Sequence, residues 1–257
     1  KMKIRILFSL AISLLLACQG LKKPETQSSD SDDVVENKSV IERNLEKYVS
    51  VPLTADLSSL SENQKKMIPI FIEVAQIMDA IFWKEAYGEA DGLLSSLDNE
   101  LEKKFVRINY GPWDRLAGNK PFIDGVGEKP AGANFYPADM TKEEFEEADI
   151  EDKASLYTIL RRDSNGELYS IAYKKAFKAE LQKASSLLKQ AAELAENQNL
   201  KNYLNKRAEA FLTDEYMESD LAWMDMKMNQ LDIICGPIET YEDQLFGSRA
   251  AFESYVL

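Results

Sequence analysis

The feature that most constrains the fold is a stripe of apolar side chains within residues 61–87. These side chains recur at spacings of three and four: Met67, Phe71, Val74, Ile77, Met78, Ile81 and Phe82. Such spacing places them on one face of an α-helix, which has 3.6 residues per turn. The sequence therefore predicts one long helix that lies deep in the core.

Helical patterns also occupy much of the remaining chain, and two regions predict strands instead. Further helices are predicted at 34–49, 90–105, 141–148, 199–213 and 214–228, with a long helix starting near 173 and carrying an apolar stripe from Phe177 to Ala195. Alternating residues flank the turn sequence at 163–166, which is typical of a β-hairpin. β-branched or apolar runs at 231–235 and 251–257 predict two more strands. The expected class is α+β, helix-rich, with one hairpin and a small sheet near the C-terminus.

A long stretch rich in glycine, proline and aromatic residues separates two of these helices, from Asn109 to Asp139. Loops of this length are usually functional or bound to another part of the protein. Just after it, Thr141 and Glu144 have the spacing of a capping box at a helix start.

The N-terminus has the order of a bacterial lipoprotein export signal. Positive charges at Lys1, Lys3 and Arg5 precede an apolar run that ends in small Ala17 before Cys18. The run is too short for a membrane-spanning helix. We therefore expect a signal peptide at 1–17, a lipid-carrying Cys18, and a flexible tether over 18–33. The protein would be anchored by lipid to a membrane of the bacterial cell envelope and face outside the cytoplasm.

Charge and cysteine content limit the binding partners and the disulfide bonds that are expected of this chain. The chain has 31 basic and 44 acidic residues and a net charge of −13. Removing the three cations of the signal makes the exported part more acidic still, so nucleic acid is not expected as a partner. Once Cys18 carries lipid, Cys235 has no cysteine to pair with. It lies within an apolar strand, where a buried inert thiol is expected.

Histidine is absent from all 257 positions. This excludes the Ser-His-Asp and Cys-His nucleophile systems and the HExxH zinc motif within this sequence.

The densest polar cluster follows the strand at 231–235 and spans residues 236–249. Its residue types alone indicate a charged surface turn. A hydrolase based only on Glu239, Glu242 and Asp243 fits poorly, because paired catalytic carboxylates lie across a cleft and these three lie within one loop.

The order of residues in this cluster resembles the dipeptidyl peptidase III family of zinc metallopeptidases. The matching positions are Ile238-Glu239-Thr240-Tyr241, Asp243, Phe246-Gly247, Arg249 and Phe252-Glu253, preceded by Phe211 and Trp223. The segments 109–115, 121–122 and 129–141 resemble the shorter exported bacterial branch of that family. Together they cover roughly residues 60–257.

This resemblance implies the first lobe of a two-lobed enzyme that cleaves dipeptides from peptide N-termini. The family's zinc ligands are two histidines and a glutamate in an HExxxH helix and an EExxxE segment, which would lie beyond Leu257. Residues 34–257 would then be an incomplete N-terminal lobe that lacks the zinc-bearing C-terminal lobe. We expect zinc in the full-length protein, none in this chain, and no catalytic residue here.

The resemblance also assigns candidate roles to individual residues. Asp232 aligns with the family's substrate-amine glutamate, although a solvent carboxylate on an edge strand is an equal alternative. Ile234 stands where the family has a transition-state tyrosine, so that role is unfilled unless Tyr241 or Tyr136 takes it. Substrate binding is assigned to Asp232, Glu239 and Tyr241. Asp243 and Arg249 are assigned a structural role in the loop. The same structural role is the alternative to substrate binding for Glu239 and Tyr241.

Two functions from different classes follow. The first is the N-terminal, peptide-binding portion of a dipeptidyl peptidase III-like zinc-dependent hydrolase. The alternative is a non-catalytic helix-rich lipoprotein that binds peptide or another extracytoplasmic partner.

Overall fold

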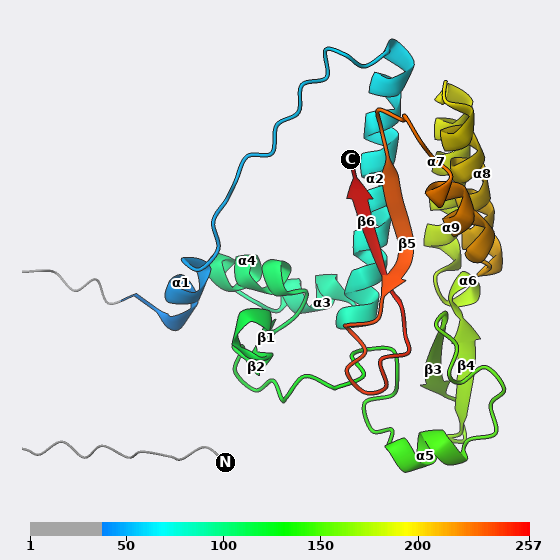
Figure 1. The fold of residues 1–257 in the computed structure, drawn as a ribbon. Coiled ribbons are helices and arrows are strands. Elements are labelled where there is room, and N and C mark those ends of the chain that lie inside the picture. The colour runs from blue at the N-terminus through cyan, green and yellow to red at the C-terminus, as the bar shows by residue number, and fades with distance from the viewer. Residues whose placement is uncertain (1–37) are drawn as a thin grey trace, which may run out of the picture. The chain divides into compact units, whose positions relative to one another are not determined.

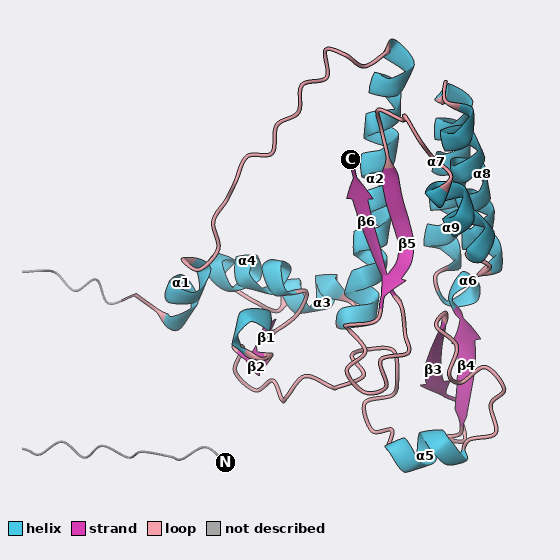
Figure 2. Cartoon of the chain, viewed as in Figure 1, coloured by secondary structure: helices cyan, strands magenta, loops and turns pink. Residues whose placement is uncertain are grey.

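The computed structural model describes residues 38–257 (Figure 1). The helices are α1 (Val40–Leu45), α2 (Glu62–Ala86), α3 (Ala90–Ser95), α4 (Glu100–Asn109), the 3-10 helix η1 (Arg115–Ala117), α5 (Lys142–Glu147), α6 (Tyr173–Ala176), α7 (Lys178–Leu194), α8 (Gln198–Thr213) and α9 (Met217–Met224). The strands are β1 (Trp113–Asp114), β2 (Lys120–Pro121), β3 (Thr158–Arg162), β4 (Leu168–Ala172), β5 (Ile233–Glu239) and β6 (Ala251–Val256). This confirms the helix-rich α+β class (Figure 2). The predicted signal, Cys18 and the tether lie outside the described residues.

Helix α2 is the central element, as its stripe predicted. Ser61 forms a capping box with Gln64, which satisfies backbone N–H groups at the start of the helix. Every stripe residue from Met67 to Phe82 is buried. The helix packs against α7 on one side and β6 on another (Figure 1). Burial of this apolar face therefore joins the helical part of the fold to the β5–β6 sheet.

Within residues 38–257 the strands form three separate antiparallel pairs, β1–β2, β3–β4 and β5–β6. In the last pair Ile233 lies opposite Val256 and Glu239 opposite Ala251, with a bulge between Pro237 and Glu239. Strand β5 thus runs further than the predicted 231–235 and includes the first part of the polar cluster. Its side chains Ile233 and Cys235 are buried in the core with Phe252 of β6.

Several predicted helices are shorter or divided. The expected helix at 90–105 is two helices, because Asn99 caps a new start by accepting the N–H of Leu101. The long helix from 173 breaks at Phe177 into α6 and α7. Thr141 caps α5, but the Glu144 side chain turns to Arg162 instead of completing a capping box. The ion pair of Glu144 with Arg162 of β3 thus replaces the second hydrogen bond of the capping box.

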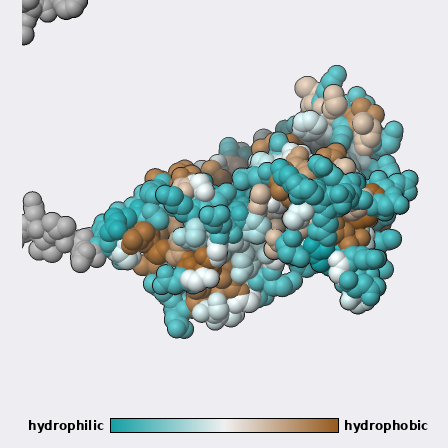
Figure 3. Space-filling model, turned by 90° about the horizontal axis from the view of Figure 1, so that it is seen from below, coloured by the Kyte–Doolittle hydropathy of each residue, from teal (hydrophilic) through white to brown (hydrophobic). Residues whose placement is uncertain are grey.

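The surface of the described part is mixed. On the face in Figure 3, patches of hydrophobic residues lie open among hydrophilic ones. Within residues 38–257, no helix combines the length and the apolar character needed to cross a membrane.

Candidate functional site

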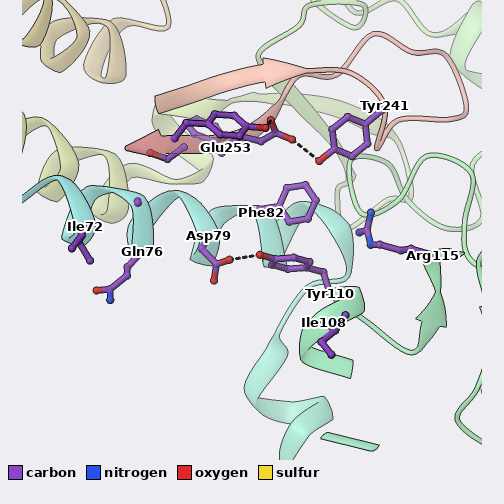
Figure 4. Close-up of a pocket in the computed structure, with 13 residues that line it drawn as sticks. Ile72, Gln76, Asp79, Phe82, Ile108, Tyr110, Arg115, Tyr241 and Glu253 are labelled. Atoms are coloured by element: carbon purple, nitrogen blue, oxygen red, sulfur yellow. Dashed lines mark hydrogen bonds between the residues drawn. The ribbon is translucent and has the colours of Figure 1, made fainter. Parts of the chain in front are cut away.

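A pocket of about 610 Å³ lies between α2 and β6 (Figure 4). Its walls are partly apolar and partly aromatic, with two carboxylates and one guanidinium. They come from α2, α4, the segment after β1, the loop after β5, and β6: Ile72, Ala75, Gln76, Asp79, Phe82, Ile108, Tyr110, Arg115, Tyr241, Phe252, Glu253, Ser254 and Tyr255. Apolar walls with a few converging polar groups are typical of ligand sites.

Three tyrosines donate hydrogen bonds to the two carboxylates of this pocket. Tyr110 donates its hydroxyl to Asp79, and Tyr241 donates to Glu253 (Figure 4). Tyr255 donates a second, longer hydrogen bond of 3.3 Å to Glu253. Burial and the adjacent carboxylates raise the pKa of both Tyr110 and Tyr241 well above the ordinary value. These hydroxyls therefore stay protonated and act as donors at neutral pH.

Arg115 joins the pocket to a buried cluster of charges. Its guanidinium donates to both oxygens of Glu242, at 2.7 and 3.2 Å, and lies 5.5 Å from the centre of the Phe82 ring. Lys129 also pairs with Glu242, whose side chain is almost completely buried. Burial opposes ionisation, but the hydrogen bond from Arg115 and the charge of Lys129 hold the pKa of Glu242 below its ordinary value.

Asp243 lies at the centre of the loop between β5 and β6. Its carboxylate accepts the Tyr136 hydroxyl at 2.8 Å and four backbone N–H groups, those of Leu245, Phe246, Ser248 and Arg249, at 2.9 to 3.1 Å. The side chain is buried. This geometry fixes the path of the loop.

Arg249 fastens the same loop to the segment before β3. It is fully buried, and its guanidinium donates to the carbonyl oxygen of Ser155 at 2.5 Å and to that of Lys153. The guanidinium also lies 5.0 Å from the centre of the Tyr136 ring. Asp243 and Arg249 thus fix the loop through these contacts, and neither lines the pocket between α2 and β6.

The three residues assigned to substrate binding are not brought together. Asp232 precedes β5 and exchanges backbone hydrogen bonds with Leu257, at the end of the sheet opposite to Glu239 and Tyr241. Glu239 lies seven positions after Asp232 along extended chain, which spans about 23 Å. Tyr241 lines the pocket, whereas Glu239 is exposed at the end of β5.

Asp232 itself is half-buried, with one engaged and one unengaged carboxylate oxygen. Trp223 donates its indole N–H to Oδ2 at 3.1 Å, while Oδ1 is buried without a hydrogen-bond partner. Burial raises the pKa of this carboxyl, against the lowering effect of the Trp223 hydrogen bond. The neighbouring Ile234, at the position where the resemblance implies a tyrosine, offers no polar side-chain group.

Tyr136 and Cys235, the remaining candidate residues, lie in the core. Trp113 and Tyr136 are buried, and the Cys235 thiol is enclosed, so that burial raises its pKa to about 12. Sequence reasoning missed Glu85, which is buried on α2 and accepts the N–H of Phe252 at 2.8 Å. The sequence did contain a signal for its burial. Glu85 follows Ile81 and Phe82 by four and three positions, which places it on the apolar face of the helix.

The described residues do not fit a zinc site. Within 38–257 no group of three histidine, cysteine, aspartate or glutamate side chains could hold a metal ion. Histidine is absent from the whole sequence. A catalytic zinc needs about three protein ligands, and residues 38–257 do not bring such a set together.

Comparison with known proteins supports one family. The model of peptidase family M49 matches residues 127–257. Nudix hydrolase 3 of Arabidopsis thaliana is 33% identical over 84% of this chain and 36% of its own length. The chain thus spans about a third of that curated relative.

Solved structures agree in fold over most of the chain. Dipeptidyl peptidase III from Caldithrix abyssi is 41% identical, with a TM-score of 0.78, over 83% of this chain and 43% of that one. The enzyme from Corallococcus sp. strain EGB is 32% identical, with a TM-score of 0.79, over 84% of this chain and 42% of that one. The chain belongs to peptidase family M49, the dipeptidyl peptidase III family.

Proposed function

We propose that this chain supplies the peptide-binding portion of a dipeptidyl peptidase III-like, zinc-dependent peptide hydrolase and lacks the zinc site itself. The similarity to two solved dipeptidyl peptidase III structures, over more than four-fifths of this chain, carries the proposal. The zinc ligands would lie in a part of the protein outside this sequence. On its own, the chain binds peptide but does not cleave it.

A direct assay tests the prediction that this chain alone does not cleave peptides. The chain from residue 19 onward is expected to release no dipeptide from peptide substrates, with or without added zinc, because residues 38–257 offer no set of zinc ligands. Dipeptidyl peptidase III from Caldithrix abyssi, assayed in parallel, shows that the assay detects turnover. Robust zinc-dependent release by this chain would overturn the proposal.

Asp232 is proposed to bind the free amino group of the peptide. Its half-buried carboxylate accepts one hydrogen bond from Trp223, and the charge of this carboxylate would pair with a substrate ammonium. Asp232→Asn is expected to weaken binding of tetra-alanine about tenfold or more, since a hydrogen bond to a charged group contributes roughly 1.5–3 kcal/mol. Isothermal titration calorimetry measures the change.

Two controls isolate the amine contact. N-acetylated tetra-alanine should bind the unmodified chain and Asp232→Asn equally, because it has no ammonium. Asp225→Asn makes the same charge change at an exposed position and should leave affinity unaltered. Equal affinity of Asp232→Asn and the unmodified chain for the free-amine peptide would contradict the assignment.

The second candidate is a non-catalytic helix-rich lipoprotein that binds peptide or another extracytoplasmic partner. The absence of histidine favours it. Reading the gene past the codon for Leu257 separates the two. An in-frame HExxxH segment would favour the peptidase, and a stop codon would favour the binding protein.

We further propose that lipid on Cys18 anchors the protein to a membrane of the cell envelope. Cys18→Ala is expected to move the protein from the membrane fraction to the soluble fraction, because each acyl methylene contributes about 0.8 kcal/mol to membrane binding. Mass spectrometry should find the acyl chains lost. Cys235→Ala, which removes the buried thiol, should stay lipidated and membrane-bound. Unchanged membrane association of Cys18→Ala would refute the anchor.

A further inference from the structure

A second pocket, distinct from the one between α2 and β6, lies beside β3. It has a volume of about 350 Å³, and its walls include Tyr87, Trp113, Pro130, Pro137 and Arg161. No aspartate or glutamate lines it, although acidic residues outnumber basic ones in the chain. The pocket therefore combines flat apolar walls with positive charge.

Arg161 is the source of the uncompensated charge. Its guanidinium donates only to backbone carbonyl oxygens, those of Leu160 at 2.7 Å, Asn134 at 3.0 Å and Phe135 at 3.4 Å. Within residues 38–257 it makes no ion pair with a carboxylate. A guanidinium has five N–H donors, so these three bonds leave two donors over.

The adjacent Arg162 shows the contrast. Its guanidinium engages the carboxylates of Asp139 and Glu144, at distances down to 2.5 Å. The charge of Arg162 is thus neutralised locally, while that of Arg161 is not. Burial lowers the pKa of Arg161, and the group that opposes this effect is the Tyr169 hydroxyl instead of a carboxylate. A half-buried cation without a counter-ion gains most from an anion that enters the pocket.

We infer that this pocket binds a small monocarboxylate carried on an apolar or aromatic body, with Arg161 as its anion-binding residue. One unpaired guanidinium matches one carboxylate in charge and planar geometry. The proline and aromatic walls suit an apolar body, and the volume suits a ligand of about the size of an aromatic acid. A phosphate fits less well, because its second charge would find no further unpaired cation. The Trp113 indole N–H is already donated to the carbonyl oxygen of Gly127, at 2.9 Å, so it is not counted as a contact to the ligand.

A matched pair of ligands tests the inference. 3-Phenylpropionate and 3-phenylpropanamide share their shape and differ in charge. Calorimetry with the unmodified chain should show the acid binding about tenfold or more tighter than the amide, because it alone pairs with the guanidinium. Tryptophan fluorescence should change on binding, since Trp113 lines the pocket. Equal affinity of acid and amide would overturn the inference, as would no saturable binding of the acid.

Variants assign the effect to Arg161. Arg161→Gln should remove the preference for the acid, and Arg161→Lys should retain part of it. Arg107→Gln makes the same charge change at an exposed position of α4 and should keep the full preference. A preference that persists in Arg161→Gln would overturn the assignment. If Arg161→Gln fails to fold, the comparison of acid with amide on the unmodified chain still decides.

A second pair of ligands identifies the source of the carboxylate. The dipeptide Ala-Phe with a free C-terminus is compared with its C-terminal amide. Preference for the free acid supports a peptide C-terminus as the ligand, whereas binding of 3-phenylpropionate alone supports a free aromatic acid. The inference does not depend on the proposed peptidase function, so either can fail alone.

Discussion

Asp243→Ala is expected to lower the free energy of unfolding by about 3–5 kcal/mol, because several buried donors would lose their acceptor at a cost of roughly 1–3 kcal/mol each. The Tyr136 hydroxyl and four backbone N–H groups would lose their common acceptor inside the protein. Each buried donor left without a partner carries a desolvation cost. Urea unfolding at pH 7, followed by circular dichroism, measures the change.

The neighbouring Glu239→Ala is the matched control. Glu239 also carries a carboxylate, four positions earlier, but it is exposed. Its removal should change stability by no more than about 0.5 kcal/mol. Asp243→Asn keeps one acceptor oxygen, so its loss of stability should lie between those of Glu239→Ala and Asp243→Ala. A loss below about 1 kcal/mol for Asp243→Ala would show that the loop does not depend on this carboxylate.

The sequence predicted the elements that repeat a pattern locally. The stripe within 61–87 predicted a helix, and α2 spans Glu62–Ala86. The alternation on both sides of 163–166 predicted the β3–β4 hairpin. Divided helices were harder, because a polar cap such as Asn99 lies inside an otherwise continuous helical pattern. One capping hydrogen bond outweighs the periodicity there.

The site was less predictable, because its contacts join distant parts of the chain. Residue order singled out the 236–249 cluster, but not its partners. Arg115 and Glu242 are 127 positions apart, and nothing in either local sequence signals their pairing. Arg249 likewise binds carbonyl oxygens, which every residue carries. Tertiary packing alone selects such partners.

Glu85 gives the second prediction with a large effect, a dependence of stability on pH. Burial raises the pKa of this carboxyl well above its ordinary value of 4.5, and the charges of Glu242 and Glu253 add to the rise. The hydrogen bond from the Phe252 N–H opposes it. The other oxygen, Oε1, is buried without a partner. The folded protein therefore holds Glu85 protonated above pH 4.5, where the unfolded chain releases that proton.

The sign of the effect follows from this difference. Below the unfolded pKa the carboxyl is protonated in both states and costs nothing. As pH rises, the unfolded state is favoured by ionisation, so folding stability falls by up to about 1.4 kcal/mol per pH unit until the folded pKa is reached. Glu85→Gln stays neutral at every pH. The variant should gain stability relative to the unmodified protein as pH rises above 4.5.

Urea unfolding of both proteins at several pH values measures that gain. Glu89→Gln, an exposed change three residues beyond α2, is the control and should give a small difference that does not vary with pH. A constant difference between Glu85→Gln and the unmodified protein would mean that Glu85 ionises equally in both states. A growing difference would instead locate a buried neutral acid at the junction of α2 and β6, one turn of helix beyond Phe82 in the pocket wall.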